Sequence, residues 1–233
     1  MPAILTIDWD YFFNVDLNTR DFDFPQILDG RVKSIPDNSV WLSDETYKAP
    51  QSFDNRSFLR LIQALGKVSF HRAFVSENHG EMYNVVTEYV RKKDKNNDPI
   101  EIVNVDYHHD YSFNNGDKLC CDNWARLLAE KYPDTTIKWC KREDSVTTSF
   151  GCPVPVEDRT FDEVIKSLGV NHFDYVHLCR SDLYSPPLSD GKFNLLMTMI
   201  ADCAGMRSPI VLDHLSDREE YFKYKELYRK ECR

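Results

Sequence analysis

The sequence predicts a three-layer α/β/α domain with a mostly parallel sheet, and two observations support that prediction. Short apolar runs rich in β-branched residues recur at residues 3–8, 39–43, 68–76, 100–106, 135–140, 174–179 and 209–212. Amphipathic stretches lie between several of these runs. Strands alternating with helices are typical of a parallel sheet covered on both faces. The 233 residues suit one such domain, so we expect a single domain over residues 1–233.

The expected helices follow the helical spacing of apolar side chains. They cover residues 57–65, 81–93 and 123–131, a segment beginning at Thr160, and residues 193–204 and 218–231. Thr160 and Glu163 have the spacing of a capping box, which favours a helix start there. Residues 14–38, with many Asp and Pro, and residues 141–159, with Gly151 and two prolines, are expected loops.

Composition excludes several classes of protein. The net charge of −9 argues against a general nucleic-acid binder, whose affinity depends on basic side chains. No apolar stretch approaches the roughly 20 residues that span a membrane. The first strand begins at once, which leaves no room for a signal peptide, and the seven cysteines have irregular spacing. We therefore expect a cytoplasmic protein with reduced thiols, and the sequence leaves homo-oligomerisation open.

Two of the apolar runs end in closely spaced carboxylates. These are Asp8 and Asp10 after the first run, and Asp106 and Asp110, with His108 between them, after the run at residues 100–105. The carboxyl ends of parallel strands meet at the edge of the sheet where ligands bind in α/β proteins. Four carboxylates gathered there would repel one another unless cations lay between them. Either motif alone could be a solvated strand end or a helix cap, but together they predict a metal centre.

A third strand end supplies an imidazole to the same edge. The apolar residues 73–76 are followed by His79, and Gly80 permits a tight turn after it. A lone histidine at such a junction could be a cap or a surface residue, but beside five other candidate ligands we expect His79 to be the sixth. A mixed set of Asp and His ligands with excess oxygen suits Mn²⁺ better than structural zinc.

Together these motifs resemble the arginase/ureohydrolase superfamily, and most of all a small, circularly permuted arginase-like family that includes bacterial peptide arginases. Asp106, His108 and Asp110 match the family's Asp-x-His-x-Asp motif in full. His79 matches the Gly-Gly-x-His turn only through its histidine and its place after a strand. Asp8 and Asp10 match a motif that arginases carry late in the chain, and a circular permutation would reconcile this. The resemblance covers roughly residues 3–13, 72–128 and 174–188.

The resemblance implies an arginase-like fold with two Mn²⁺ ions per chain. The first ion would be held by His79, Asp106, Asp110 and Asp8, and the second by Asp106, His108, Asp8 and Asp10. The substrate would be an arginine-containing ribosomal precursor peptide, with arginine side chains converted to ornithine and urea released. Asp10 or His109 could deliver the proton to the leaving amine, although His109 could equally be a packing residue.

Substrate recognition requires a carboxylate that faces the guanidinium group, because a carboxylate fixes its plane through paired hydrogen bonds. Glu77 is the leading candidate, since it adjoins the His79 turn, and Glu45 is the alternative. Asp182 follows a strand that ends in Arg180, where arginases place substrate-facing residues, although an ordinary ion pair is the alternative reading. Asn123 belongs to an Asn-Trp pair found in the arginase-like family, and we include it among the expected substrate-binding residues.

Other functions compete with peptide arginase. A ureohydrolase could act on free arginine or agmatine, and an amidohydrolase could use a single Zn²⁺ as histone-deacetylase-like relatives do. The protein could also be a non-catalytic metal-binding or partner-binding scaffold. A two-metal phosphoesterase is disfavoured, because no basic phosphate clamp is evident in the sequence.

Overall fold

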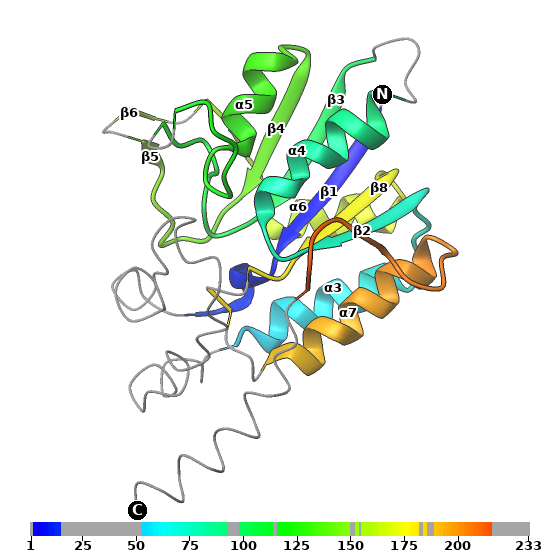
Figure 1. Ribbon diagram of the computed structural model, residues 1–233. Helices are drawn as coiled ribbons and strands as arrows, with labels where there is room; N and C mark the ends of the chain where they lie inside the picture. Colours follow the sequence, from blue (N-terminus) through cyan, green and yellow to red (C-terminus); the bar gives the residue numbers. More distant parts are fainter. Residues whose placement is uncertain are drawn as a thin grey trace, which may run out of the picture.

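The computed structural model describes residues 2–14, 53–92, 98–113, 116–149, 152–153, 155–181, 184–185 and 189–215. A seven-stranded parallel sheet with the order β7-β4-β3-β1-β8-β2-β9 runs through the domain (Figure 1). Its strands are β1 Ala3–Asp8, β2 Arg72–Ser76, β3 Ile100–Val105, β4 Thr135–Cys140, β7 Glu157–Asp158, β8 Tyr175–Cys179 and β9 Ile210–Val211. Strands β5, Thr148–Ser149, and β6, Cys152–Pro153, form a separate antiparallel pair.

Helices cover both faces of the sheet, which confirms the predicted three-layer α/β/α class (Figure 1). One face carries α3 Asn55–Leu65, α6 Phe161–Gly169 and α7 Asp190–Cys203. The other carries α5 Trp124–Lys131 and a continuous helical segment formed by η4 His79–Glu81, α4 Met82–Asn84 and the π-helical η5 Val85–Val90. A further 3-10 helix, η1 Trp9–Phe12, follows β1 directly.

Alternating residues of the central strands supply two separate hydrophobic cores. Leu5 and Ile7 of β1 pack with α3, α6 and α7, whereas Ile4 packs with the α4 and α5 layer. All six residues of β1 are buried, and so are all six of β3. Strands covered on both faces have no solvent-facing side, which is why these two are mainly apolar in sequence and show no regular polar alternation.

Most predicted elements agree with the structure, and the differences have local causes. Strand β2 begins at Arg72 rather than at residue 68, because residues 68–70 pack beside α7, where Phe70 donates a backbone hydrogen bond to Cys203. The expected loop at 141–159 contains β5, β6 and β7. Strands of two residues are too short to show any periodicity. The expected elements at 15–38, 39–43 and 218–231 lie outside the described residues.

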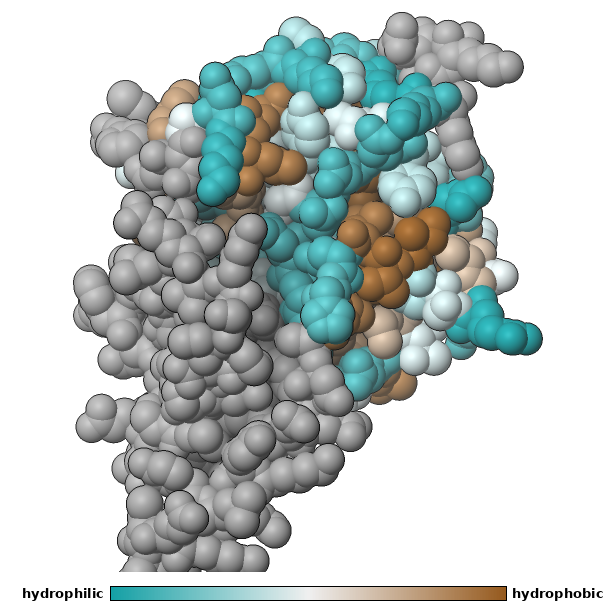
Figure 2. All heavy atoms as spheres, viewed as in Figure 1, coloured by the Kyte–Doolittle hydropathy of each residue, from teal (hydrophilic) through white to brown (hydrophobic). Residues whose placement is uncertain are grey.

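Among the described residues on the face drawn in Figure 2, hydrophilic side chains alternate with separate areas of hydrophobic ones. Among the described residues, no helix has both the length and the apolar character needed to cross a membrane.

Candidate metal centre

The N-terminal strand lies in the middle of the sheet, beside the strand that carries the second carboxylate motif. Strand β1 pairs with β3 on one side and with β8 on the other, and Ile7 is in register with Val105. Asp8 and Asp106 are therefore at the carboxyl ends of adjacent strands. The expectation that the two motifs meet at one edge of the sheet is confirmed.

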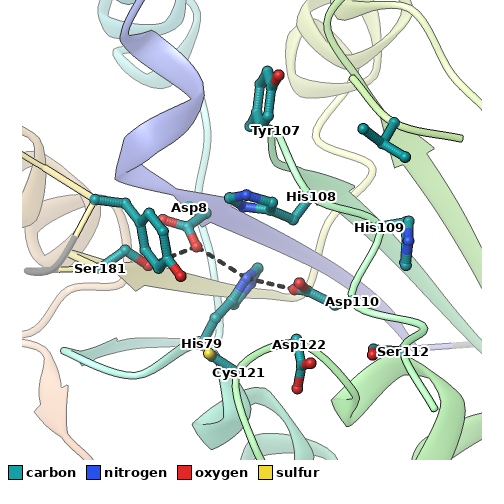
Figure 3. Close-up of a pocket in the computed structure, with 12 residues that line it drawn as sticks. Asp8, His79, Tyr107, His108, His109, Asp110, Ser112, Cys121, Asp122 and Ser181 are labelled. Carbon is teal, nitrogen blue, oxygen red and sulfur yellow. Dashed lines mark hydrogen bonds and ion pairs between the residues drawn. The ribbon is translucent and has the colours of Figure 1, made fainter. Parts of the chain in front are cut away.

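A first group of ligand atoms surrounds the imidazole of His79. Its Nδ1 atom lies 3.2 Å from an Asp8 oxygen, 3.0 Å from one of Asp106 and 2.9 Å from one of Asp110. Figure 3 shows the His79 ring between Asp8 and Asp110. All four side chains are buried, so the charge of the three carboxylates lies in a region with little water to screen it.

Two turns bring His79 and Asp110 together. Asp110 has φ 51°, a left-handed conformation that is uncommon outside glycine, and the Trp124 indole donates a hydrogen bond to its carboxylate. Gly80 is needed because a Cβ atom there would lie 3.0 Å from the carbonyl oxygen of Cys120 and 3.0 Å from the Asn78 side-chain oxygen. Left-handed backbone at a non-glycine residue is typical of functional sites.

A second group lies beside the first and shares Asp106 with it. His108 Nδ1 is 3.1 Å from an Asp10 oxygen and 3.9 Å from an oxygen of Asp106. Asp10 is fully buried at the start of η1, whose first turn is capped by the Asp8 carboxylate. The His108 side chain is 36% exposed, and this ring therefore faces the solvent side of the centre.

The electrostatics of the centre reflect an excess of buried carboxylates. Burial and the neighbouring carboxylates raise the pKa of Asp8 and of Asp106. For His79, burial opposes protonation, but Asp110 and the other carboxylates outweigh it and raise the pKa well above the usual value. Burial also opposes protonation of His108, but mainly Asp10 outweighs it and raises the pKa of His108 to about 9. The centre therefore attracts positive charge strongly.

The donor atoms fit metal ions. Asp8, His79 and Asp106 each offer one atom within 4.8 Å of the others, and so do Asp10, Asp106 and His108. The Nδ1 atom of His79 is buried, and its contacts with the carboxylates lack the geometry of hydrogen bonds among the described residues. A nitrogen held against three carboxylate oxygens without a hydrogen bond is the arrangement expected of a metal ligand. The two groups could therefore hold metal ions.

A pocket of about 230 Å³ adjoins both groups, and Figure 3 shows residues that line it. Its lining includes His79, His108, Asp8 and Asp110, and beyond these ligands also Asp122. Among the described residues, no lysine or arginine lines it. The pocket thus suits a small cationic group and lacks the basic side chains that a phosphate would need.

His109, one of the two expected proton carriers, also lines the pocket. Its Nδ1 atom accepts a hydrogen bond from the Tyr111 backbone N–H at 2.9 Å, so a neutral ring carries its proton on Nε2. Burial and the adjacent His108 lower its pKa. Asp10, the other expected carrier, is not part of the lining and lies behind His108.

Two expected substrate-binding residues have other partners in the structure. The Glu77 carboxylate binds the Arg180 guanidinium through both oxygens, and neither residue lines the pocket. The side-chain amide of Asn123 accepts from the backbone N–H of Cys120 and donates to the carbonyl of Lys118, each at 2.8 Å. Asn123 thereby orders the loop before α5. Glu45 and Asp182 lie outside the described residues.

Several residues at the centre were not singled out from the sequence. Ser181, with φ 46°, donates a hydrogen bond of 2.7 Å to Asp8, and Asp122 contributes the further carboxylate of the pocket. Thr6 and His177 are buried polar residues inside β1 and β8, in register with each other. A polar residue in the middle of an apolar run was the available signal for these two.

Comparisons of the chain with protein-family models, with curated proteins and with solved structures found no match. The fold and the donor geometry therefore carry the functional argument: a parallel α/β sheet whose strand ends gather six Asp and His side chains into two adjoining groups that could hold metal ions.

Proposed function

We propose that this protein is a binuclear manganese hydrolase that acts on the guanidinium group of arginine residues in a ribosomal precursor peptide. The observation that carries the proposal is the pair of ligand groups that share Asp106 beneath a pocket without lysine or arginine in its described lining. A shared carboxylate is the usual bridge in two-metal hydrolytic sites, where the ions act as a pair.

The proposed reaction adds water across one C–N bond of the substrate. Two Mn²⁺ ions held by the ligand groups would polarise the guanidinium and lower the pKa of a water molecule toward neutrality. The water oxygen joins the guanidinium carbon, the bond from that carbon to the side-chain nitrogen breaks, and the products are urea and ornithine. The leaving amine needs a proton. Asp10 and His109 remain the proposed carriers, and the place of His109 in the pocket lining favours it.

The pocket supports a single cationic side chain as the group that enters. Its volume of about 230 Å³ is smaller than that of a typical drug-sized site but suits one arginine side chain. Asp122 lines it and belongs to neither ligand group, so we propose Asp122, in place of Glu77, as the carboxylate that orients the guanidinium. A cytoplasmic setting also belongs to this proposal, supported by the buried thiols of Cys140 and Cys179, which form no disulfide.

Urea release tests the proposed function directly. Protein loaded with Mn²⁺ is incubated with an arginine-containing peptide, and separately with free arginine and with agmatine. Urea and a peptide mass loss that corresponds to ornithine are then measured. We expect turnover of the peptide in preference to the small molecules, and two Mn²⁺ per chain by elemental analysis.

The other outcomes distinguish the competing functions. Turnover of free arginine or agmatine alone would make the protein a small-molecule ureohydrolase. One tightly bound Zn²⁺ with release of an acyl group would favour an amidohydrolase, and metal binding without hydrolysis of any guanidine would favour a scaffold.

A further inference from the structure

A chain of buried polar side chains lies behind His79, on the side away from the carboxylates. The Nε2 atom of His79 is 2.8 Å from the hydroxyl of Thr6, which is 3.0 Å from Nδ1 of His177. Nε2 of His177 is in turn 2.9 Å from the hydroxyl of Ser76. His79 is 1% exposed and the other three are fully buried. We call these four residues the histidine relay.

The hydroxyl of Ser76 determines how the protons are arranged along the relay. It donates its single proton to the carbonyl oxygen of Asn78 at 2.8 Å. The same oxygen can therefore only accept from His177, which places a proton on Nε2 of that ring. His177 is fully buried, and its two ring nitrogens contact the hydroxyls of Thr6 and Ser76, neither of which carries a charge. A buried ring with only neutral partners is favoured in its neutral form, so its Nδ1 is an acceptor.

The remaining hydrogen bonds of the relay can be assigned because each hydroxyl group has only one proton to donate. Thr6 must donate to the acceptor nitrogen of His177, and its oxygen then accepts from Nε2–H of His79. The proton of a neutral His79 is thus placed on Nε2. Its Nδ1 atom, which faces Asp8, Asp106 and Asp110, keeps the lone pair that a metal ion requires.

The relay is built on the sheet rather than on the loops of the site. Thr6 comes from β1, His177 from β8 and Ser76 from β2, which are adjacent strands, and Thr6 and His177 are in register. Strand pairing therefore fixes the spacing of the relay before any ligand binds. The hydrogen bonds of the relay have a fixed order of donor and acceptor, and this order sets the protonation of His79, a candidate ligand. A polar cluster with a purely structural role would not require that order.

We propose that Thr6 and His177 are positioning residues that hold His79 in the tautomer with its proton on Nε2, and so present Nδ1 as a metal ligand. The inference rests on the proposed metal site and identifies the residues that prepare it. Outer partners of a metal-binding histidine commonly change metal affinity 10- to 100-fold, and we expect an effect of about that size here.

The test combines ring ¹⁵N NMR with metal titration in wild type, Thr6→Val and Thr6→Ser. Valine keeps the shape of threonine but has no hydroxyl, and serine restores the hydroxyl. Protein labelled with ¹⁵N-histidine is loaded with Zn²⁺, a diamagnetic probe, and Mn²⁺ affinities are measured by calorimetry. Ile4→Val, a buried change on the same face of β1, is the control for packing.

We expect wild type and Thr6→Ser to show His79 with a proton on Nε2 and a metal-bound Nδ1. In Thr6→Val we expect the proton on Nε2 of His79 to exchange faster with solvent, because its hydrogen-bond acceptor is gone. The affinity for one of the two ions should fall about 10- to 100-fold. Ile4→Val should match the wild type. Wild-type affinity and an unchanged His79 ring in Thr6→Val would overturn the inference.

The metal-free protein separates this inference from the proposed function. Neutral His177 should carry its proton on Nε2 there, and a proton on Nδ1 would overturn the relay whatever metals bind. If His177 carries its proton on Nε2 but the wild-type protein binds no divalent ion, the metal site is overturned, and the ligand role of His79 with it. Metal binding without hydrolysis of guanidines would overturn the proposed reaction alone and support the relay.

Discussion

Strand β3 has a buried carboxylate near each end, and the two are treated in opposite ways. Glu101, near the start, contacts Lys138, Arg159 at 3.3 Å and His172 at 2.8 Å. Burial acts to raise its pKa, but Lys138 and His172 outweigh burial and lower it. Asp106, just beyond the other end, lies among Asp8, Asp10 and Asp110, and its pKa is raised. At Glu101 the chain supplies a lysine and an arginine to one carboxylate, whereas at Asp106 two histidines lie among four carboxylates.

This difference separates a structural charge from a functional one. At Glu101 the folded protein favours the ionised carboxylate, and the cluster contributes to stability. At Asp106 the folded protein disfavours ionisation, because burial and the neighbouring carboxylates raise its pKa more than His79 lowers it. A site with that imbalance costs stability until cations from outside enter it. Substitutions at Glu101 and at Asp106 should therefore change the stability of the metal-free protein in opposite directions.

The largest expected effect is that of Asp106→Asn. Asp106 belongs to both ligand groups, so we expect this variant to lose both metal ions and at least about 10³-fold of its urea-releasing activity. The metal-free variant should be more stable than the metal-free wild type at pH 8, because one repelling charge is gone. Elemental analysis, turnover and denaturant unfolding provide the measurements.

Asp202→Asn, an exposed change on α7, serves as the control for the Asp106 variant and should behave as the wild type. Stoichiometric metal and full activity in Asp106→Asn would contradict the assignment of the centre. A loss of stability in its metal-free form would contradict the contrast with Glu101.

Metal loading should give the next largest effect. An excess of Mn²⁺ about 1,000-fold above its dissociation constant should stabilise the fold by about 4 kcal/mol for each ion bound. The metal-free protein should also become more stable as the pH falls from 8.5 to 7. His108, with a folded pKa of about 9, and Asp106, with one of about 7, keep protons that the unfolded chain has released.

Bound metal displaces those protons, so the loaded protein should lose this pH dependence. Denaturant unfolding at several pH values, with chelator or with Mn²⁺, measures both slopes. Equal slopes in the two states would show that the ligand groups do not exchange protons for metal.

Glu101→Gln should lower the free energy of unfolding, whereas Asp106→Asn should raise that of the metal-free protein. The amide leaves Lys138 and Arg159 without their carboxylate, which should cost about 2 kcal/mol in free energy of unfolding. The wild type should also lose stability as the pH falls below about 4.5, because the lowered pKa of Glu101 favours its charged form in the folded state. Glu157→Gln, an exposed change on β7, is the matched control. Greater stability in Glu101→Gln would overturn the distinction.

The smallest effect is expected for Asp122→Asn, which tests a third kind of carboxylate. Asp122 lines the pocket without belonging to either ligand group, so metal content should be unchanged. Loss of a charged hydrogen-bond acceptor should raise KM for the arginine peptide about 10-fold, or about 1.4 kcal/mol, with kcat changed little. Steady-state kinetics measures this, and an unchanged KM would assign guanidinium recognition to another residue.

The sequence located candidate metal ligands where those residues follow the ends of strands. Asp8, Asp106 and His79 each follow an apolar run, and such runs locate the carboxyl edge of a parallel sheet. Glu77 also adjoins a strand end, yet its carboxylate binds Arg180 of β8's following turn. Nothing near Glu77 in the sequence indicates that partner, because strand order, not chain order, makes them neighbours.

The fold class, the bounds of the central strands and the residues that could bind metal were predictable from the sequence, because they depend on local patterns of apolar and polar side chains. The position of β1 between β3 and β8 is seen only in the folded chain, and it brings Asp8 beside Asp106 and Thr6 beside His177. The physical reason is that strand pairing depends on how buried faces pack over the whole sheet. Residues far apart in the chain therefore share one site, and their charges interact only once the sheet has formed.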